Sequence, residues 1–431
     1  MRIIELYQHQ KNALAETKNF NKVAYYHDMG LGKTFTGSEK MISFNTEMNL
    51  IVCQKSKIND WIEHLRKYYD DKFFIYDLAK SRDFRLFTYT IETLKDYPEL
   101  RDTKYNTVGV INYDLIFRRP KLLELNDFTL MLDESSMIQN ETAKRSKFIL
   151  KMKPKNVILL SGTPTGGKYE RLWSQMKLLG WNISKDLYWR QYIDVEIIDN
   201  EGFPIKIVKG YKNVERLKQK MRDYGAHFLK SNEVFDLPNQ INNKIYVQTT
   251  KEYRKFKRIS IVIIDGIEIV GETILTKMLY ERQLCGQYNN NKFNAFSDIL
   301  ESTNDRLIVF YNFKNELEQL KEMSIDRPIS IVSGDIKDLE AYETYDNSIT
   351  FIQYQAGAMG LNLQKANKII YFTPPLSSEL FEQSKKRTHR IGQTETCYYY
   401  YLICKNSIEE RIYEALEKRK DYTENLFKRP N

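Results

Sequence analysis

The sequence has few cysteines and no long apolar run. Its 431 residues include only four scattered cysteines: Cys53, Cys285, Cys397 and Cys404. This number is too small for a disulfide framework, and no pair has the Cys-x-x-Cys spacing of a zinc site, so we expect reduced thiols in an intracellular protein. The longest apolar run, 259–270, is interrupted by Asp265, Gly266 and Glu268, and no secretory apolar core follows Met1. We therefore expect a cytoplasmic protein without a membrane partner.

Acidic residues are outnumbered by basic ones, 57 against 66, which gives a formal net charge of +9. A basic balance favours a polyanionic partner such as nucleic acid. A solvated basic surface would give the same charge, so composition alone does not decide between the two interpretations. We find no internal repeat and no low-complexity tail in the sequence.

Two series of short apolar segments predict an α/β fold. The first series is 49–53, 107–111, 129–132 and 157–160, and the second is 307–310, 329–332, 349–352 and 368–372. Nearly continuous apolar strands separated by helical stretches are typical of parallel sheets covered on both faces. We therefore predict two doubly wound parallel-sheet lobes with helical insertions, at 1–240 and 241–431. Such sheets bind ligands at the carboxyl ends of their strands.

The boundary between the lobes is predicted from composition. Residues 169–230 are rich in Lys, Arg, Trp and Tyr, and we expect a mainly helical extension of the first lobe over about 169–237. A Leu-Pro-Asn sequence followed by Asn-Asn makes 238–243 the best hinge candidate, because it interrupts both helix and strand periodicities.

Two elements of the second lobe have clear local signals. The Asp265-Gly266 pair between apolar residues predicts a small β-ribbon over 261–270. Ile408, Ile412 and Leu416 recur at helical spacing, which predicts a final amphipathic helix packed on the core.

A glycine-containing stretch, Asp28-Met29-Gly30-Leu31-Gly32-Lys33-Thr34, lies between an apolar run and a helix-compatible run. This context is typical of a phosphate-binding loop, in which glycines permit a tight turn and the helix N-terminus presents N–H groups to phosphates. Lys33 would reach the β- and γ-phosphates, and the Thr34 hydroxyl would ligate Mg²⁺. The full pattern has glycine where this chain has His27, so a plain strand-to-helix turn is the alternative.

Polar residues also follow two later strands. Asp133 and Glu134 come directly after 129–132, so one carboxylate could hold Mg²⁺, directly or through water, and the other could orient or deprotonate an attacking water. A helix N-cap is the alternative. Ser161-Gly162-Thr163-Pro164 follows 157–160 and could sense the γ-phosphate, although an ordinary turn would have the same composition.

Two further candidates depend on helices. Gln10 lies in a predicted amphipathic helix, where its amide could pair with both edges of adenine; an exposed helical glutamine is the alternative. Arg387 and Arg390 lie three residues apart in a basic cluster, so on a helix they would share one face. A solvated charged face is the alternative for this cluster.

Taken in order, these motifs resemble those of the superfamily 2 helicase-like motors, and specifically the Swi/Snf-type DNA translocase ATPases. The most specific pieces are the 28–34 stretch and the Arg-x-x-Arg-Ile-Gly-Gln sequence that ends at Gln393. Supporting matches are 112–114, 228–230 with 237–238, 282–285 and 356–363. The resemblance runs from about Leu6 to Leu416 and implies two RecA-like lobes that bind ATP and Mg²⁺ and act on DNA.

The resemblance also implies roles for matching residues. Nucleotide-binding residues would be Gln10, Asp28, Met29, Gly30, Leu31, Gly32, Lys33, Thr34, Gly360 and Gln383. Thr34 and Asp133 would hold Mg²⁺, and the catalytic residues would be Lys33, Asp133, Glu134 and the arginine fingers Arg387 and Arg390. The DNA backbone would meet Lys55, Ser56, Asn112, Ser333, Gly334, Gln355, Ala356 and Gly357. The chain departs from the family at Ser136, where the family has histidine.

We therefore expect a bare motor of a bacterial or phage-infected cell, because no histone-reading, zinc or targeting module is recognisable at either end. Its predicted function is ATP-driven translocation along duplex DNA by a monomer, with replication, recombination or repair proteins as candidate partners. A strand-separating helicase is the second candidate, because its nucleotide chemistry would look alike. A non-catalytic nucleotide-dependent clamp is the third, and the presence of Lys33, Glu134 and Arg390 disfavours it.

Overall fold

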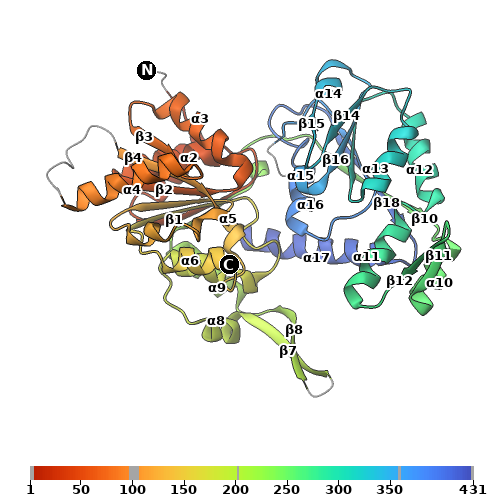
Figure 1. The fold of residues 1–431 in the computed structure, drawn as a ribbon, viewed down its shortest axis with the longest axis horizontal. Coiled ribbons are helices and arrows are strands. Elements are labelled where there is room, and N and C mark those ends of the chain that lie inside the picture. Colours follow the sequence, from red (N-terminus) through yellow and green to blue (C-terminus); the bar gives the residue numbers. More distant parts are fainter. Residues whose placement is uncertain (1–3, 97–105, 201–202, 358–360, 429–431) are drawn as a thin grey trace. The chain divides into compact units, whose positions relative to one another are not determined.

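The computed structural model describes residues 4–96, 106–200, 203–357 and 361–428. The chain forms two compact units, Met1–Val234 with Tyr422–Asn431, and Phe235–Asp421. Each unit contains one seven-stranded sheet accompanied by helices (Figure 1). The prediction of an α/β fold with two doubly wound RecA-like lobes is confirmed.

The sheet of the first unit is parallel throughout. Its strands lie in the order β3 (Phe73–Asp77), β4 (Asn106–Asn112), β2 (Met48–Cys53), β5 (Thr129–Asp133), β6 (Asn156–Ser161), β1 (Lys22–His27) and β9 (Ala226–Leu229). Because parallel strands bring their carboxyl ends to one edge, residues that follow the neighbouring strands β5, β6 and β1 lie close together.

Helices cover both faces of this sheet because alternate strand side chains point to opposite sides. Val23 and Tyr25 of β1 join one buried cluster, whereas Ala24 and Tyr26 join another. The helices of this unit are α1 (Gln8–Glu16), α2 (Lys33–Phe44), α3 (Ile58–Tyr69), α4 (Ser81–Asp96), α5 (Tyr113–Ile116), α6 (Lys144–Lys151), α7 (Trp173–Leu178), α8 (Lys185–Tyr192) and α9 (Val214–Asp223).

The segment expected to be a mainly helical extension contains strands as well. β7 (Ile193–Asn200) and β8 (Phe203–Tyr211) form an antiparallel hairpin (Figure 1), and β9 adds an edge strand to the main sheet. The helical expectation is wrong over these residues because 193–197 alternate Ile or Val with Asp or Glu. Alternation of β-branched and polar residues is a strand pattern rather than a helical one.

The second unit has a mostly parallel sheet. Its order is β10 (Gln240–Val247), β18 (Cys397–Cys404), β17 (Lys368–Tyr371), β13 (Leu307–Tyr311), β16 (Ile349–Gln353), β14 (Ile329–Val332) and β15 (Lys337–Asp338). The short strand β15 pairs antiparallel with β14. Strand β10 begins inside the segment 238–243, so four residues of the expected hinge belong to the sheet.

The helices of the second unit are α10 (Lys251–Ile259), α11 (Ile274–Cys285), α12 (Asn290–Glu301), α13 (Lys314–Glu322), α14 (Glu340–Thr344), α15 (Tyr354–Gly357) and α16 (Ser378–Lys385).

The predicted ribbon is confirmed: β11 (Ile261–Ile264) and β12 (Ile267–Val270) pair antiparallel, and Asp265 and Gly266 both have positive φ at its turn. The final helix, α17 (Ile408–Phe427), buries Ile408, Ile412 and Leu416 as predicted. Its last turn, from Tyr422, belongs to the first unit.

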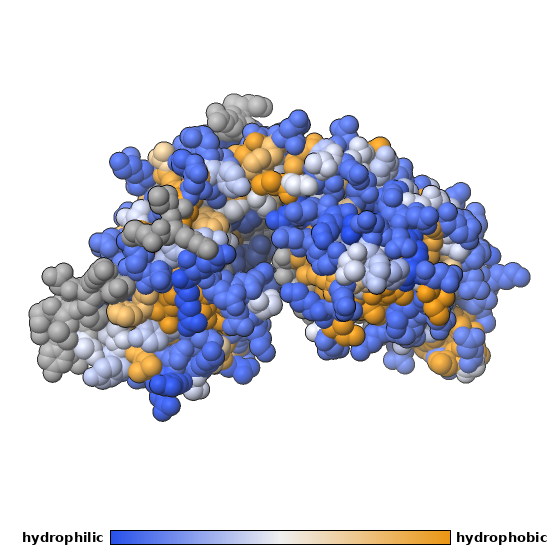
Figure 2. Space-filling model, turned by 90° about the horizontal axis from the view of Figure 1, so that it is seen from above, coloured by the Kyte–Doolittle hydropathy of each residue, from blue (hydrophilic) through white to orange (hydrophobic). Residues whose placement is uncertain are grey.

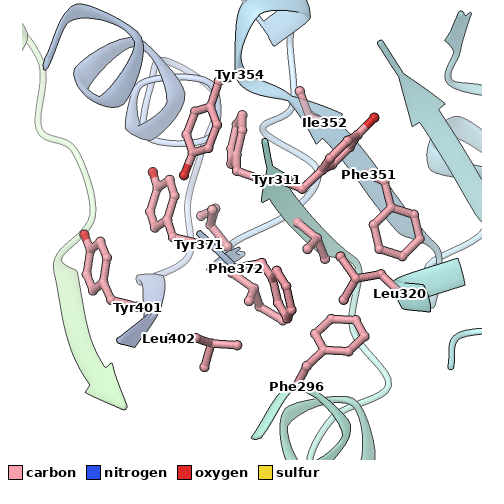
Figure 3. Packing of buried hydrophobic residues seen from close by; sticks show 14 of the residues in the cluster. Phe296, Tyr311, Leu320, Phe351, Ile352, Tyr354, Tyr371, Phe372, Tyr401 and Leu402 are labelled. Carbon is pink, nitrogen blue, oxygen red and sulfur yellow. The ribbon is translucent and has the colours of Figure 1, made fainter. Parts of the chain in front are cut away.

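Aromatic side chains from neighbouring strands form much of the core of the second unit. The rings of Tyr371 and Tyr401 stack with centroids 5.1 Å apart, and Tyr354 stacks on Tyr371 at 6.3 Å (Figure 3). Such offset stacking adds to the free energy of burying large rings. The tyrosine-rich strand β18 therefore has a packing role at its inward-facing positions.

Hydrophilic residues cover much of the molecular face seen in Figure 2, with separate hydrophobic areas between them. Among the described residues, no helix is long and apolar enough to cross a membrane.

Candidate functional site

The stretch 28–32 joins strand β1 to helix α2, which is the strand, loop and helix arrangement predicted for it. Gly30 and Gly32 have φ values of 86° and 67°, a region that residues with a Cβ rarely adopt. A Cβ on Gly32 would also lie 2.5 Å from Nε2 of Gln10. Both positions therefore favour glycine, and Gly32 also leaves room for the Gln10 side chain of α1.

Lys33 begins α2 and turns back over the loop. Its Nζ donates to the carbonyl oxygens of His27 at 2.8 Å and Asp28 at 3.1 Å. A Cβ built on Gly162, just after β6, would lie 3.6 Å from the same Nζ. The Lys33 ammonium thus lies where the ends of β1 and β6 meet, and Thr34 follows it in the first turn of α2.

Gln10 is almost fully buried, with 2% of its surface exposed. Its Nε2 donates to the Gly32 carbonyl at 3.0 Å, and its Oε1 accepts from the Tyr7 N–H at 2.9 Å. The alternative of an exposed helical glutamine is therefore wrong. The amide that we expected to read adenine ties the start of α1 to the 28–32 loop.

The two carboxylates follow β5 and are oriented by different partners. Oδ2 of Asp133 accepts the indole N–H of Trp61 at 2.8 Å, and burial raises the pKa of Asp133. Glu134 has a φ of 53°, which is costly for a residue with a long side chain. Its Oε2 accepts from the Ser161 hydroxyl at 3.3 Å, and it makes no side-chain cap to the short helix that follows. The cap alternative therefore does not hold for Glu134.

The arginine pair of the second unit lies beyond α16 rather than on it. The helix ends at Lys385, and the following turn is held by hydrogen bonds from the Leu363 N–H to the Arg387 carbonyl at 3.1 Å and between His389 Nε2 and the Pro238 carbonyl at 2.8 Å. The expectation that both arginines share a helix face is therefore wrong. These contacts to segments distant in sequence end the helix early.

Neither arginine belongs to a fully solvated face. Arg387 is only 3% exposed, and Arg390 donates to the Asn362 side chain, with partial burial lowering the pKa of its guanidinium. Gln383 is buried in α16 and contacts Glu379. Gly360, the remaining predicted nucleotide contact, lies outside the described residues.

The residues predicted to meet DNA differ in exposure. Lys55, Ser56, Gly334 and Gln355 are exposed, and Ser333 is half-buried. Asn112 and Ala356 are buried, at 7% and 1% exposure, so only their backbone or a small part of the side chain faces solvent. Gly357 ends α15. In the first unit, 55–56 and Asn112 lie at the ends of β2 and β4, on the same sheet edge as Lys33 and Asp133.

Three contributors to this edge were not predicted from sequence. Trp61 orients Asp133, His9 contacts the Leu31 carbonyl at 3.1 Å, and Ser231 donates through its N–H and hydroxyl to Asp28 Oδ2 at 3.1 and 2.9 Å. His9 adjoins Gln10 in the sequence and could have been found by that proximity. Trp61 and Ser231 are distant from the residues that they contact and give no local signal.

Two protein-family models match consecutive parts of this chain. The model of the SNF2-related domain matches residues 12–290, and that of the helicase conserved C-terminal domain matches residues 291–392. A solved structure, the Sulfolobus solfataricus SWI2/SNF2 ATPase core in complex with dsDNA, is 20% identical in sequence. It covers 98% of this chain, with 93% of its own chain matched, and superposes with a TM-score of 0.44.

Curated relatives match along nearly the whole chain. An uncharacterized ATP-dependent helicase of Mycoplasma genitalium is 23% identical over 91% of this chain and 39% of its own length. The mouse SWI/SNF-related matrix-associated actin-dependent regulator of chromatin subfamily A member 1 is 24% identical, over 90% of this chain and 40% of its own length. The human DNA annealing helicase and endonuclease ZRANB3 is 21% identical, over 92% of this chain and 38% of its own length. This chain thus spans less than half the length of these relatives. Because the domain model covers well over half of its residues, the chain belongs to the SNF2-related domain family.

Proposed function

We propose that this protein is an ATP-hydrolysing motor that translocates along duplex DNA. The observation that carries the proposal is the gathering of Lys33, Glu134 and the 161–163 turn at one edge of a parallel sheet, where β5, β6 and β1 end side by side. A glycine-bounded loop, a lysine at a helix N-terminus and two carboxylates at this edge suit the binding and hydrolysis of a nucleoside triphosphate. Membership of the SNF2-related family supports ATP as the nucleotide and DNA as the track.

The residues also fit a magnesium ion. The Thr34 hydroxyl and Asp133 carboxylate are oxygen donors of the kind that Mg²⁺ prefers, and Trp61 fixes the second oxygen of Asp133. When bound, the ion would neutralise charge on the β- and γ-phosphates. Lys33 adds positive charge on the same phosphates, and Glu134 orients or deprotonates the attacking water. The resemblance to the Swi/Snf-type ATPases assigns the remaining charge compensation to Arg387 and Arg390, of which Arg387 is buried in this structure.

Phosphate contacts from both units would grip the duplex. Lys55 and Ser56 in the first unit and Gly334 and Gln355 in the second are exposed, and the net charge of +9 favours a polyanionic track. Contacts to phosphates ignore sequence, so movements of the two units driven by ATP hydrolysis would move such grips along DNA.

Translocation is favoured over strand separation because neither candidate position for a wedge offers an exposed aromatic side chain. Separation requires a side chain inserted between base pairs, at a cost of a few kcal/mol per step. The turn of the β11–β12 ribbon is Asp265-Gly266, which is charged and small. Tyr188, the other candidate with Trp189, is fully buried, and Trp189 packs partly buried against the core of its unit.

Steady-state ATP turnover tests the proposal, measured with duplex DNA, single-stranded DNA, RNA and no polymer. We expect the largest stimulation with duplex DNA. Equal turnover under all four conditions would contradict a DNA motor, and no turnover with any of them would favour the non-catalytic clamp.

A further inference from the structure

His27 stands where the usual phosphate-loop pattern has glycine, and its side chain has an unusual environment. The ring is fully buried, and its Nε2 lies 2.8 Å from Nδ1 of His227 in the edge strand β9. Nε2 of His227 lies 3.4 Å from Oε2 of Glu16 in α1. These side chains form a continuous row, the His27–His227–Glu16 relay, that ends at the phosphate loop.

The hydrogen-bonding needs of His27 set the direction of the relay. Its Nδ1 is buried and has no hydrogen-bond partner among the described residues. Unpaired buried N–H groups are rarer than unpaired acceptors, so the proton belongs on Nε2 and Nδ1 is bare. His27 then donates to Nδ1 of His227, and the proton of a neutral His227 is on Nε2, which lies 3.4 Å from the Glu16 carboxylate.

The backbone of His27 contacts the lysine of the nucleotide site. Its carbonyl oxygen accepts from Lys33 Nζ at 2.8 Å. The next residue, Asp28, donates its N–H to the Leu229 carbonyl at 2.9 Å and accepts from Ser231 at its carboxylate. β9 and the turn after it therefore hold the loop through three residues, His227, Leu229 and Ser231.

We propose that His227 is a positioning residue for the phosphate loop. By accepting the Nε2–H of His27, it fixes the backbone carbonyl that orients the Lys33 ammonium, and Glu16 fixes the tautomer of His227. This inference rests on the proposed ATP site. It explains how the chain keeps a functional loop geometry with a large side chain in place of the usual glycine.

The relay connects the loop to solvent. His227 and Glu16 line a cavity of about 1080 Å³, whereas His27 is buried behind them. The groups around the pair are His9 and Glu16 from α1, Tyr25 from β1 and Lys33 from α2.

Two substitutions separate hydrogen bonding from packing. His227→Phe keeps an aromatic ring but removes the acceptor, whereas His227→Asn offers an amide oxygen near the position of Nδ1. We expect His227→Phe to weaken equilibrium ATP binding about tenfold, because it leaves a buried donor unpaired. His227→Asn should bind within about threefold of wild type. Asn12→Ala, on the same cavity wall with its side chain hydrogen-bonded to Gln8, is the matched control and should bind normally.

Imidazole ¹⁵N NMR of the unmodified protein tests the relay without any activity, and it applies even if His227→Phe fails to fold. Only five histidines need assignment. We expect His27 to be protonated at Nε2 and bare at Nδ1, with a coupling to His227 Nδ1 across the hydrogen bond. A proton on Nδ1 of His27, or normal ATP binding in His227→Phe, would overturn the positioning role. A wild-type protein that shows the relay but neither binds nor hydrolyses ATP would instead refute the proposed function.

Discussion

At the scale of residues, Lys33 and Glu134 should fail in different ways. Lys33→Ala removes the ammonium that compensates phosphate charge, so we expect ATP binding and hydrolysis to be lost together. Glu134→Gln removes the group that orients or deprotonates water but keeps the shape of the side chain, so binding should persist while hydrolysis stops. Equilibrium binding and single-turnover hydrolysis distinguish these outcomes. Equal loss of ATP affinity in both variants would contradict the assigned roles.

Arg390 gives a second test at this scale. Where an arginine finger stabilises the transferring phosphoryl group, it contributes about 10³–10⁵ in rate, so Arg390→Ala should bind ATP but lose DNA-stimulated turnover. Arg390→Lys should recover little, because an ammonium cannot reproduce the planar guanidinium fork. Turnover close to wild type in Arg390→Ala would leave this side chain with only its structural bond to Asn362.

At the scale of elements, the last turn of α17 is a part of the first unit. Leu426 is fully buried in a cluster of that unit, and the Tyr169 hydroxyl donates to the Tyr422 carbonyl at 2.6 Å. Leu426→Ala should therefore destabilise the first unit by about 2–5 kcal/mol, as large-to-small core substitutions do. All four tryptophans (Trp61, Trp173, Trp181 and Trp189) lie in this unit, so tryptophan fluorescence during urea unfolding reports its stability. Lys428→Ala is the control, and an equal effect of both substitutions would contradict the packing role.

The elements also show what sequence could and could not predict. The strands of the two predicted series and the motifs at their ends were predictable, because apolar strand runs, glycines and the Asp265-Gly266 turn are local signals. The packing of the end of α17 in the first unit was not predictable, because Tyr422 and Leu426 only continue the same helical spacing. The turn that carries Arg387 and Arg390 is fixed by contacts to Leu363 and Pro238. Those contacts join residues distant in the chain, which local periodicity does not report.

At the scale of the whole molecule, the charge of +9 should appear as a salt dependence of DNA affinity. We expect a log–log slope of about −0.9 per phosphate contacted, with little variation among sequences. Lys55→Ala should reduce that slope by about one, whereas Lys147→Ala, an exposed lysine on α6, should leave it unchanged. A DNA affinity that does not change with salt concentration would contradict DNA as the partner.

The central claim is ATP-driven movement along duplex DNA without processive strand separation. Displacement of a third strand from a blunt-ended triplex tests it most directly, run beside unwinding of a long fork by the same protein. We expect ATP-dependent triplex displacement that Glu134→Gln abolishes, and little fork unwinding. Efficient unwinding of the fork with no displacement from the triplex would contradict the account and identify a strand-separating helicase.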